Sequence, residues 1–161
     1  MRKIFSILFL VFISFLLQFF IFNILGKQCT PHFLLLLLVF ITLVLGIRYG
    51  LLTGFLSGFL LDSYSVDLFG LNTFSMIACA YLIVFLHKYI FRSGSRPAIV
   101  CLTFLVLLFD VIIKSFFHVL WGTFQWQEIF RYVVIPQVGL TLLLSTFIFR
   151  GFRQCASKLF V

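Results

Sequence analysis

The chain has 161 residues, of which 63% are hydrophobic and only 10% are charged, and its formal net charge is +8. Soluble domains carry roughly 25% charged residues, so this composition excludes an ordinary soluble domain. In a chain this apolar, an excess of Lys and Arg is expected to mark cytoplasmic loops rather than a nucleic-acid partner. The composition predicts an all-α, polytopic protein that forms a single transmembrane domain.

The first apolar run extends from Ile4 to Leu25. About 20 apolar residues span a bilayer as a helix, so this run is long enough. It follows a basic start, as a signal peptide would, but it exceeds the apolar segment of ~7–15 residues that is usual there, and no small-x-small cleavage site follows. We therefore expect an uncleaved transmembrane helix at 4–25.

The second apolar region, from Phe33 to Leu61, is ambiguous. As one helix it would be about 43 Å long, which requires a strong tilt. As a hairpin that turns at Arg48, each arm would be about 20 Å long, which is short for a hydrocarbon core of about 30 Å. Length alone leaves both a five-helix and a six-helix chain open.

The distribution of basic residues favours the hairpin. With six helices, nine of the twelve basic residues lie on the side of the two termini, and basic residues concentrate on the cytoplasmic side of a membrane protein. These nine are Arg2, Lys3, Arg48, Lys88, Arg92, Arg96, Arg150, Arg153 and Lys158. With five helices the bias is weaker and Arg48 is left near the middle of the membrane, at a cost of at least ~2.5 kcal/mol. We therefore predict six helices (alternatively five) with cytoplasmic N and C termini. Their approximate ranges are 4–25, 31–47, 49–63, 72–91, 97–121 and 129–149.

Glycines recur at every fourth residue through this hairpin, at Gly46, Gly50, Gly54 and Gly58. Small residues at helical spacing let two helix backbones approach closely in lipid. Since the turn is predicted near Arg48, only the last three belong to one helix. Gly50, Gly54 and Gly58 are therefore expected to serve in helix packing or in partner contact.

One predicted helix carries charged residues within the membrane. Asp110, Lys114 and His118 recur at i, i+4 and i+8, so they share one face of the helix at 97–121. Such residues normally face the bundle interior. One interpretation is a proton or ion relay. The other is an Asp–Lys pair that neutralises itself and either fixes helix packing or holds a partner. The packing or partner interpretation is favoured, because a relay needs acids in several helices and all other acids are placed outside.

No motif indicates catalysis, a cofactor or a metal. The external loop with Asp62 and Asp67 lacks the ligands of a calcium loop, so both are expected to be solvated. The four cysteines form no CxxC and no Cys/His cluster with zinc spacing. His32 and His87 stand singly at helix ends. Phosphate-binding, hydrolase and metalloprotease signatures are missing from the sequence. A non-enzymatic protein without cofactor or metal is expected.

Residues 31–92 carry a combination that is typical of one family. An apolar run led by Pro31 is followed by Gly54-x-x-x-Gly58-x-x-x-Asp62, and the next loop closes on Gly70-Leu71-Asn72. This pattern resembles MreD, the bacterial rod-shape-determining membrane protein. The resemblance marks Asp62, Gly70 and Asn72 as a family-like loop and brings no catalytic residues.

The resemblance implies a non-enzymatic, multi-pass subunit of the cell-wall elongation machinery (elongasome) in the inner membrane. Such a subunit would bind and stabilise MreC and help to regulate peptidoglycan synthesis, with MreB and peptidoglycan synthases as indirect partners and membrane lipid around it. The family's bundle is similar to the substrate-binding subunits of energy-coupling-factor vitamin transporters, which supply the alternative function. An enzyme of lipid chemistry is disfavoured, because the external face has too few acids, histidines and arginines.

Overall fold

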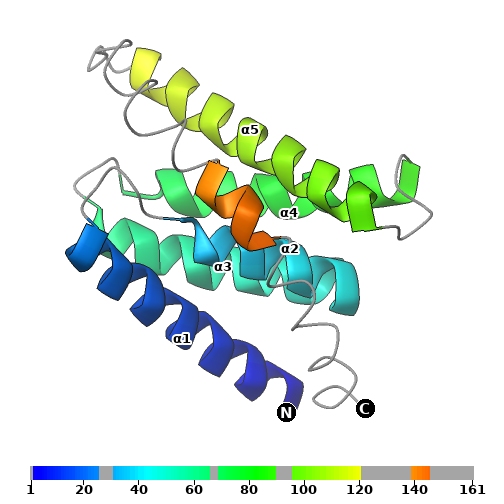
Figure 1. Cartoon of the computed structure of the whole chain (residues 1–161), viewed down its shortest axis with the longest axis horizontal. Helices are drawn as coiled ribbons and strands as arrows, with labels where there is room; N and C mark the ends of the chain where they lie inside the picture. The colour runs from blue at the N-terminus through cyan, green and yellow to red at the C-terminus, as the bar shows by residue number, and fades with distance from the viewer. Residues whose placement is uncertain (1, 26–30, 66–68, 90–95, 121–138, 146–161) are drawn as a thin grey trace.

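The computed structural model describes residues 2–25, 31–65, 69–89, 96–120 and 139–145, and this part is all-helical, without a strand. Its helices are α1 (Arg2–Leu25), α2 (Phe33–Leu45), α3 (Ile47–Tyr64), α4 (Leu71–Tyr89) and α5 (Arg96–Leu120), and residues 139–145 add a further helical segment. Successive labelled helices run in alternating directions along the long axis (Figure 1). The predicted all-α bundle with six helices is confirmed.

Helices α2 and α3 form an antiparallel hairpin around Gly46. A Cβ added at Gly50 would lie 3.0 Å from Cβ of Thr42, and one added at Gly54 would lie 3.4 Å from Cδ1 of Leu38, so residues equally far from Gly46 face each other. Gly46 has φ +88°, a conformation that residues with a Cβ rarely adopt. The turn therefore falls at Gly46 and not at Arg48, which lies in the first turn of α3.

Helix α2 is the centre of the bundle. Its residues from Leu34 to Thr42 are all buried, and it packs against α1, α3, α4 and α5. A helix that is covered on all sides must be apolar all round, which explains its run of Leu, Val, Phe and Ile. With 13 residues, it is about 20 Å long.

Two hydrophobic clusters join the outer helices to α2. One contains Leu35, Leu38 and Val39 of α2 with apolar residues of α4 and α5, including Met76, Ile83, Val106 and Leu107. The other contains Leu34, Leu37, Phe40 and Ile41 of α2 with Ile7 and Val11 of α1. Opposite faces of α2 therefore hold α1 on one side and the α4–α5 pair on the other.

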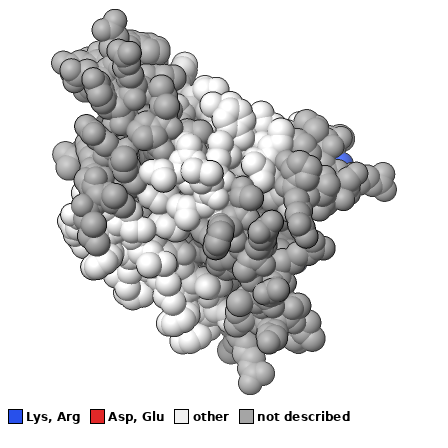
Figure 2. Space-filling view, viewed as in Figure 1, with Lys and Arg blue, Asp and Glu red and all other residues white. Residues whose placement is uncertain are grey.

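The outside of the described bundle is apolar. Large hydrophobic side chains are exposed along α1, including Phe5, Phe9, Phe12 and Phe20. Among the described residues, the face in Figure 2 shows no charged side chain apart from a small blue spot at one edge. Among the described helices, three are long and apolar enough to cross a membrane, at Ile4–Asn23, Leu71–Lys88 and Ile99–Phe117. Exposed apolar side chains on such helices are what contact with lipid requires. The chain is a membrane protein.

The alternation of the helices predicts which ends share a side of the membrane. The start of α1, the turn at Gly46, the end of α4 and the start of α5 lie at one end of the bundle (Figure 1). A membrane-impermeant maleimide is therefore expected to label Cys29, before α2, from outside intact cells. With the predicted six helices and cytoplasmic termini, it should label Cys155 only after lysis. Both cysteines lie outside the described residues. Labelling of Cys155 from outside and of Cys29 only after lysis would contradict cytoplasmic termini.

Candidate functional site

The three glycines of α3 lie against the chain's own helices. Gly50, Gly54 and Gly58 are buried. A Cβ added at Gly54 would lie 3.1 Å from the carbonyl oxygen of Met76, and one added at Gly58 would lie 2.8 Å from the amide nitrogen of Thr73. Helices α3 and α4 are therefore in backbone contact, which small residues permit.

Asp62, one turn after Gly58, binds the start of α4. Its Oδ1 accepts the Asn72 amide at 3.0 Å, while Oδ2 accepts the Thr73 amide at 2.9 Å and also the Thr73 hydroxyl. The first N–H groups of a helix have no intrahelical partner, and the positive end of the helix dipole favours a carboxylate. Asp62 thus caps α4 from a neighbouring helix.

The burial of Asp62 corrects its prediction as a solvated loop residue. It lies within α3 and is 3% exposed. Once Gly58 brings the two backbones together, a side chain one turn further along the same face reaches the start of α4. The four-residue step from Gly58 to Asp62 continues the glycine spacing, and that was the signal in the sequence.

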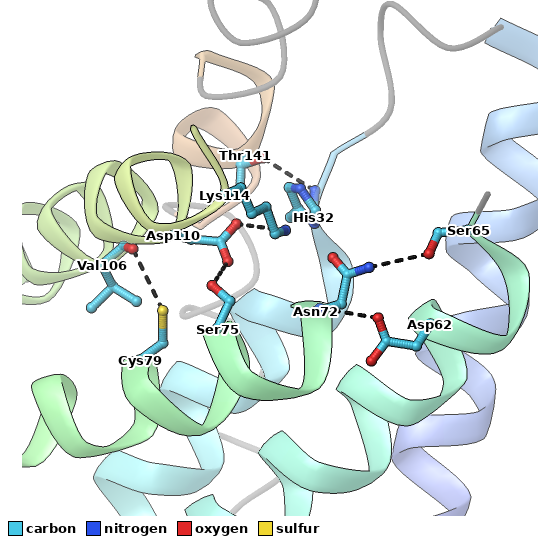
Figure 3. A network of polar contacts seen from close by, with 10 residues as sticks. All are labelled: His32, Asp62, Ser65, Asn72, Ser75, Cys79, Val106, Asp110, Lys114 and Thr141. Atoms are coloured by element: carbon cyan, nitrogen blue, oxygen red, sulfur yellow. Dashed lines mark hydrogen bonds and ion pairs between the residues drawn. The ribbon is translucent and has the colours of Figure 1, made fainter. Parts of the chain in front are cut away.

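Gly70 and Asn72 close the connection between α3 and α4. Gly70 has φ +95°, and its carbonyl accepts the amide of Phe74 at 2.9 Å. The Asn72 side chain donates from Nδ2 to Oγ of Ser65 at 3.3 Å, across the same junction (Figure 3). The residues of the family-like loop therefore meet at the start of α4, whereas Asp67 lies outside the described residues.

A second buried carboxylate binds α4 from the other side. Asp110 of α5 is 2% exposed, accepts the hydroxyl of Ser75, and pairs with Lys114 at 2.9 Å. One helical turn along this contact, Sγ of Cys79 lies 3.9 Å from the carbonyl oxygen of Val106. Asp110 and Lys114 therefore lie together as predicted from their spacing, while the side chain of His118 lies outside the described part.

His32 lies beside Asp110 and Lys114. From the sequence it was predicted to be an isolated residue at a helix end, and this proximity was not predicted. Its amide donates to Oγ1 of Thr141 at 3.2 Å, and its ring lies near enough to Asp110 and Lys114 for electrostatic interaction. Nδ1 is buried and has no hydrogen-bond partner among the residues that the structure describes. The short length of α2 could have indicated this position in the sequence, because a short helix begins inside the bundle.

We refer to His32, Ser75, Asp110, Lys114 and Thr141 as the polar cluster (Figure 3). Every carboxylate oxygen of Asp62 and Asp110 accepts at least one bond. The arrangement is thus suited to fixing helices to one another. In the described part of the chain no group of three His, Cys, Asp or Glu could hold a metal ion.

Comparison with known families identifies a match over nearly the whole chain. The model of the family described as rod shape-determining protein MreD matches residues 1–154. No curated protein matches the chain, and no solved structure does so either.

The close approach of α3 and α4 predicts a ranking of alanine variants. Gly58→Ala is expected to destabilise the protein by about 1–3 kcal/mol, since a new methyl group in a packed site forces the backbone to shift. Gly54→Ala should have a smaller effect. Gly139→Ala is the control, because no described residue lies within 4 Å of its added Cβ. The measurement is unfolding in detergent, and equal stability of Gly58→Ala and Gly139→Ala would contradict the predicted contact.

The Asp62 cap predicts a loss of stability in Asp62→Asn. The amide removes the negative charge and presents N–H groups where two backbone donors converge, so a loss of about 1–3 kcal/mol is expected. Ser63→Ala is the matched control, because Ser63 is exposed and bonds only within its own helix, to the carbonyl of Phe59. Unfolding curves of the two variants should separate. Coincident curves would show that Asp62 does not cap α4.

The Asp110–Lys114 pair predicts strong coupling in a double-mutant cycle. Asp110→Leu leaves the ammonium of Lys114 without its counter-ion, and breaking a buried pair in this way costs about 3–5 kcal/mol. Adding Lys114→Met should recover a large part of that loss, because no charge then remains at the site. Unfolding free energies of the two single variants and the double variant test this. Purely additive losses would contradict the pairing.

Proposed function

The chain belongs to the MreD family of rod shape-determining proteins, and on this premise we propose that it is the subunit of the elongation machinery that binds and stabilises MreC. Membership implies a role in determining rod shape in bacteria. The proposal places the protein in the inner membrane as a multi-pass subunit. MreB and the peptidoglycan synthases are then indirect partners, reached through MreC.

The observation that carries the proposal is the extent of the family match, which covers residues 1–154 and so nearly the whole chain. It reaches far beyond residues 31–92, where the sequence pattern is clearest. The binding of MreC is therefore assigned to the bundle as a whole and not to one segment.

The chemistry of the buried acids supports a non-enzymatic subunit. A catalytic carboxylate must have an oxygen available to reach a substrate. In the described bundle, both buried acids are occupied by the helix starts, hydroxyls and ammonium of the chain itself. Such a chain acts by presenting a stable surface, and regulation of peptidoglycan synthesis would follow from its hold on MreC.

Purification from the native membrane tests the proposal. An affinity-tagged chain, expressed at its natural level and extracted in mild detergent, is expected to recover MreC, a partner with a single membrane helix and a coiled coil. The same purification from an untagged strain is the control. Recovery of a coupling subunit with ATPases instead would support the vitamin-transporter alternative.

Depletion of the chain gives a second measurement. If it stabilises MreC, the amount of MreC in the membrane should fall as the chain is depleted, and rod-shaped cells should become round. Restoring the wild-type chain should reverse both effects. Unchanged MreC levels together with normal rod shape would overturn the proposal.

A further inference from the structure

The polar cluster contains a hydrogen-bonding position that the described chain does not fill. Among the described residues, Nδ1 of His32 is buried and has no hydrogen-bond partner, and Lys114 has one partner, Asp110. An ammonium has three donors, so two remain beside the imidazole. A buried polar atom without a partner costs about 1–3 kcal/mol.

The depth of His32 adds to the cost of leaving Nδ1 without a partner. The amide of Leu34 donates to Oε1 of Gln18 at 3.4 Å, so the start of α2 is level with Gln18 of α1. From there α1 continues to Leu25, about 10 Å further, and α5 continues from Lys114 to Leu120, about 9 Å further. Gln18 and Lys114 both lie inside membrane-crossing spans. His32 therefore lies below the ends of its neighbours, and its Nδ1 is enclosed by the surrounding side chains.

The start of α2 does not itself supply an anion site. The amide of His32 is bonded to Thr141, that of Phe33 to the carbonyl of Pro31, and that of Leu34 to Gln18. The donors and acceptors that remain are side-chain atoms of His32 and Lys114. Figure 3 shows both side chains on the same side of the Asp110 carboxylate.

The charges of the polar cluster select a neutral partner. Asp110 and Lys114 neutralise each other, so a carboxylate or phosphate would add an unbalanced charge at membrane depth. A hydroxyl group adds none, and it both accepts and donates a hydrogen bond. It can accept from Nζ of Lys114 while it donates to Nδ1 of His32.

We propose that the polar cluster is a binding site for one hydroxyl group, held between His32 and Lys114 at the start of α2. The hydroxyl comes from a single water molecule or from the alcohol of a larger neutral ligand. This inference is independent of the proposed partner.

Nitrogen-15 NMR of the full chain in nanodiscs, with labelled histidine, tests the proposal. The His32 resonances are assigned by their loss in His32→Gln, and Nδ1 is expected at the position of a hydrogen-bonded acceptor. Lys114→Met should shift this resonance, because the second anchor is lost. His87→Gln is the matched control, since His87 is exposed near the end of α4, and it should leave the His32 resonances unchanged. An unbonded Nδ1, or one bonded to another side chain of the same chain, would overturn the proposal.

The source of the hydroxyl is identified on the same preparation. Native mass spectrometry of the protein extracted from its own membrane should show a bound mass that His32→Phe loses if the hydroxyl belongs to a ligand. Magnetisation transfer from water to the His32 ring, with no bound mass, identifies a water molecule. Neither signal in the wild-type chain would contradict the site.

Discussion

The carboxylate of Asp62 at the start of α4 is the interaction on which the described bundle depends most. Its oxygens are buried and accept bonds from two backbone amides and a hydroxyl. Free amides are expensive in a membrane, because nothing in the hydrocarbon region pairs with them. The glycines make this contact possible, since a larger residue at Gly58 would hold α4 away from α3. Close approach and cap are thus two parts of one junction.

Asp110 is a second buried carboxylate that bonds α4 to a neighbouring helix, on the opposite side of α4. There the carboxylate joins Ser75 to Lys114 and so fixes α5. The hydrophobic effect does little to hold helices together inside lipid, so close packing and internal polar bonds take its place. In this chain the buried acids converge on the first two turns of α4, while the apolar helix α2 fills the centre. A membrane protein built in this way is held together by internal contacts, and its exterior stays apolar.

Much of the fold was predictable from the sequence, because hydropathy and the distribution of Lys and Arg report directly on membrane crossing. The hairpin within the second apolar region followed from the position of Arg48, although the turn lies at Gly46, where the decisive feature is a positive φ. The central place of α2 was not predictable, since residues that face lipid and residues in a membrane core are equally apolar. The pairing of Asp110 with Lys114 followed from helical spacing alone.

The contacts of Asp62 and His32 were harder to predict. Both depend on the register between helices distant in sequence, and a single sequence carries no direct signal for register. Asp62 was predicted to be a loop residue because it follows an apolar run. His32 was predicted to lie at the membrane surface because it precedes one. Asp62 is buried where α3 meets the start of α4, and Nδ1 of His32 is buried beside the Asp110–Lys114 pair.

Hydrogen exchange at the start of α4 tests the Asp62 junction most directly. In the intact protein, the amides of Asn72 and Thr73 should exchange as slowly as those in the middle of α4, although a first helical turn normally exchanges fast. In Asp62→Asn they should exchange faster, while the middle of α4 keeps its protection. Rapid exchange of both amides in the wild-type chain would contradict the cap and, with it, the junction between α3 and α4.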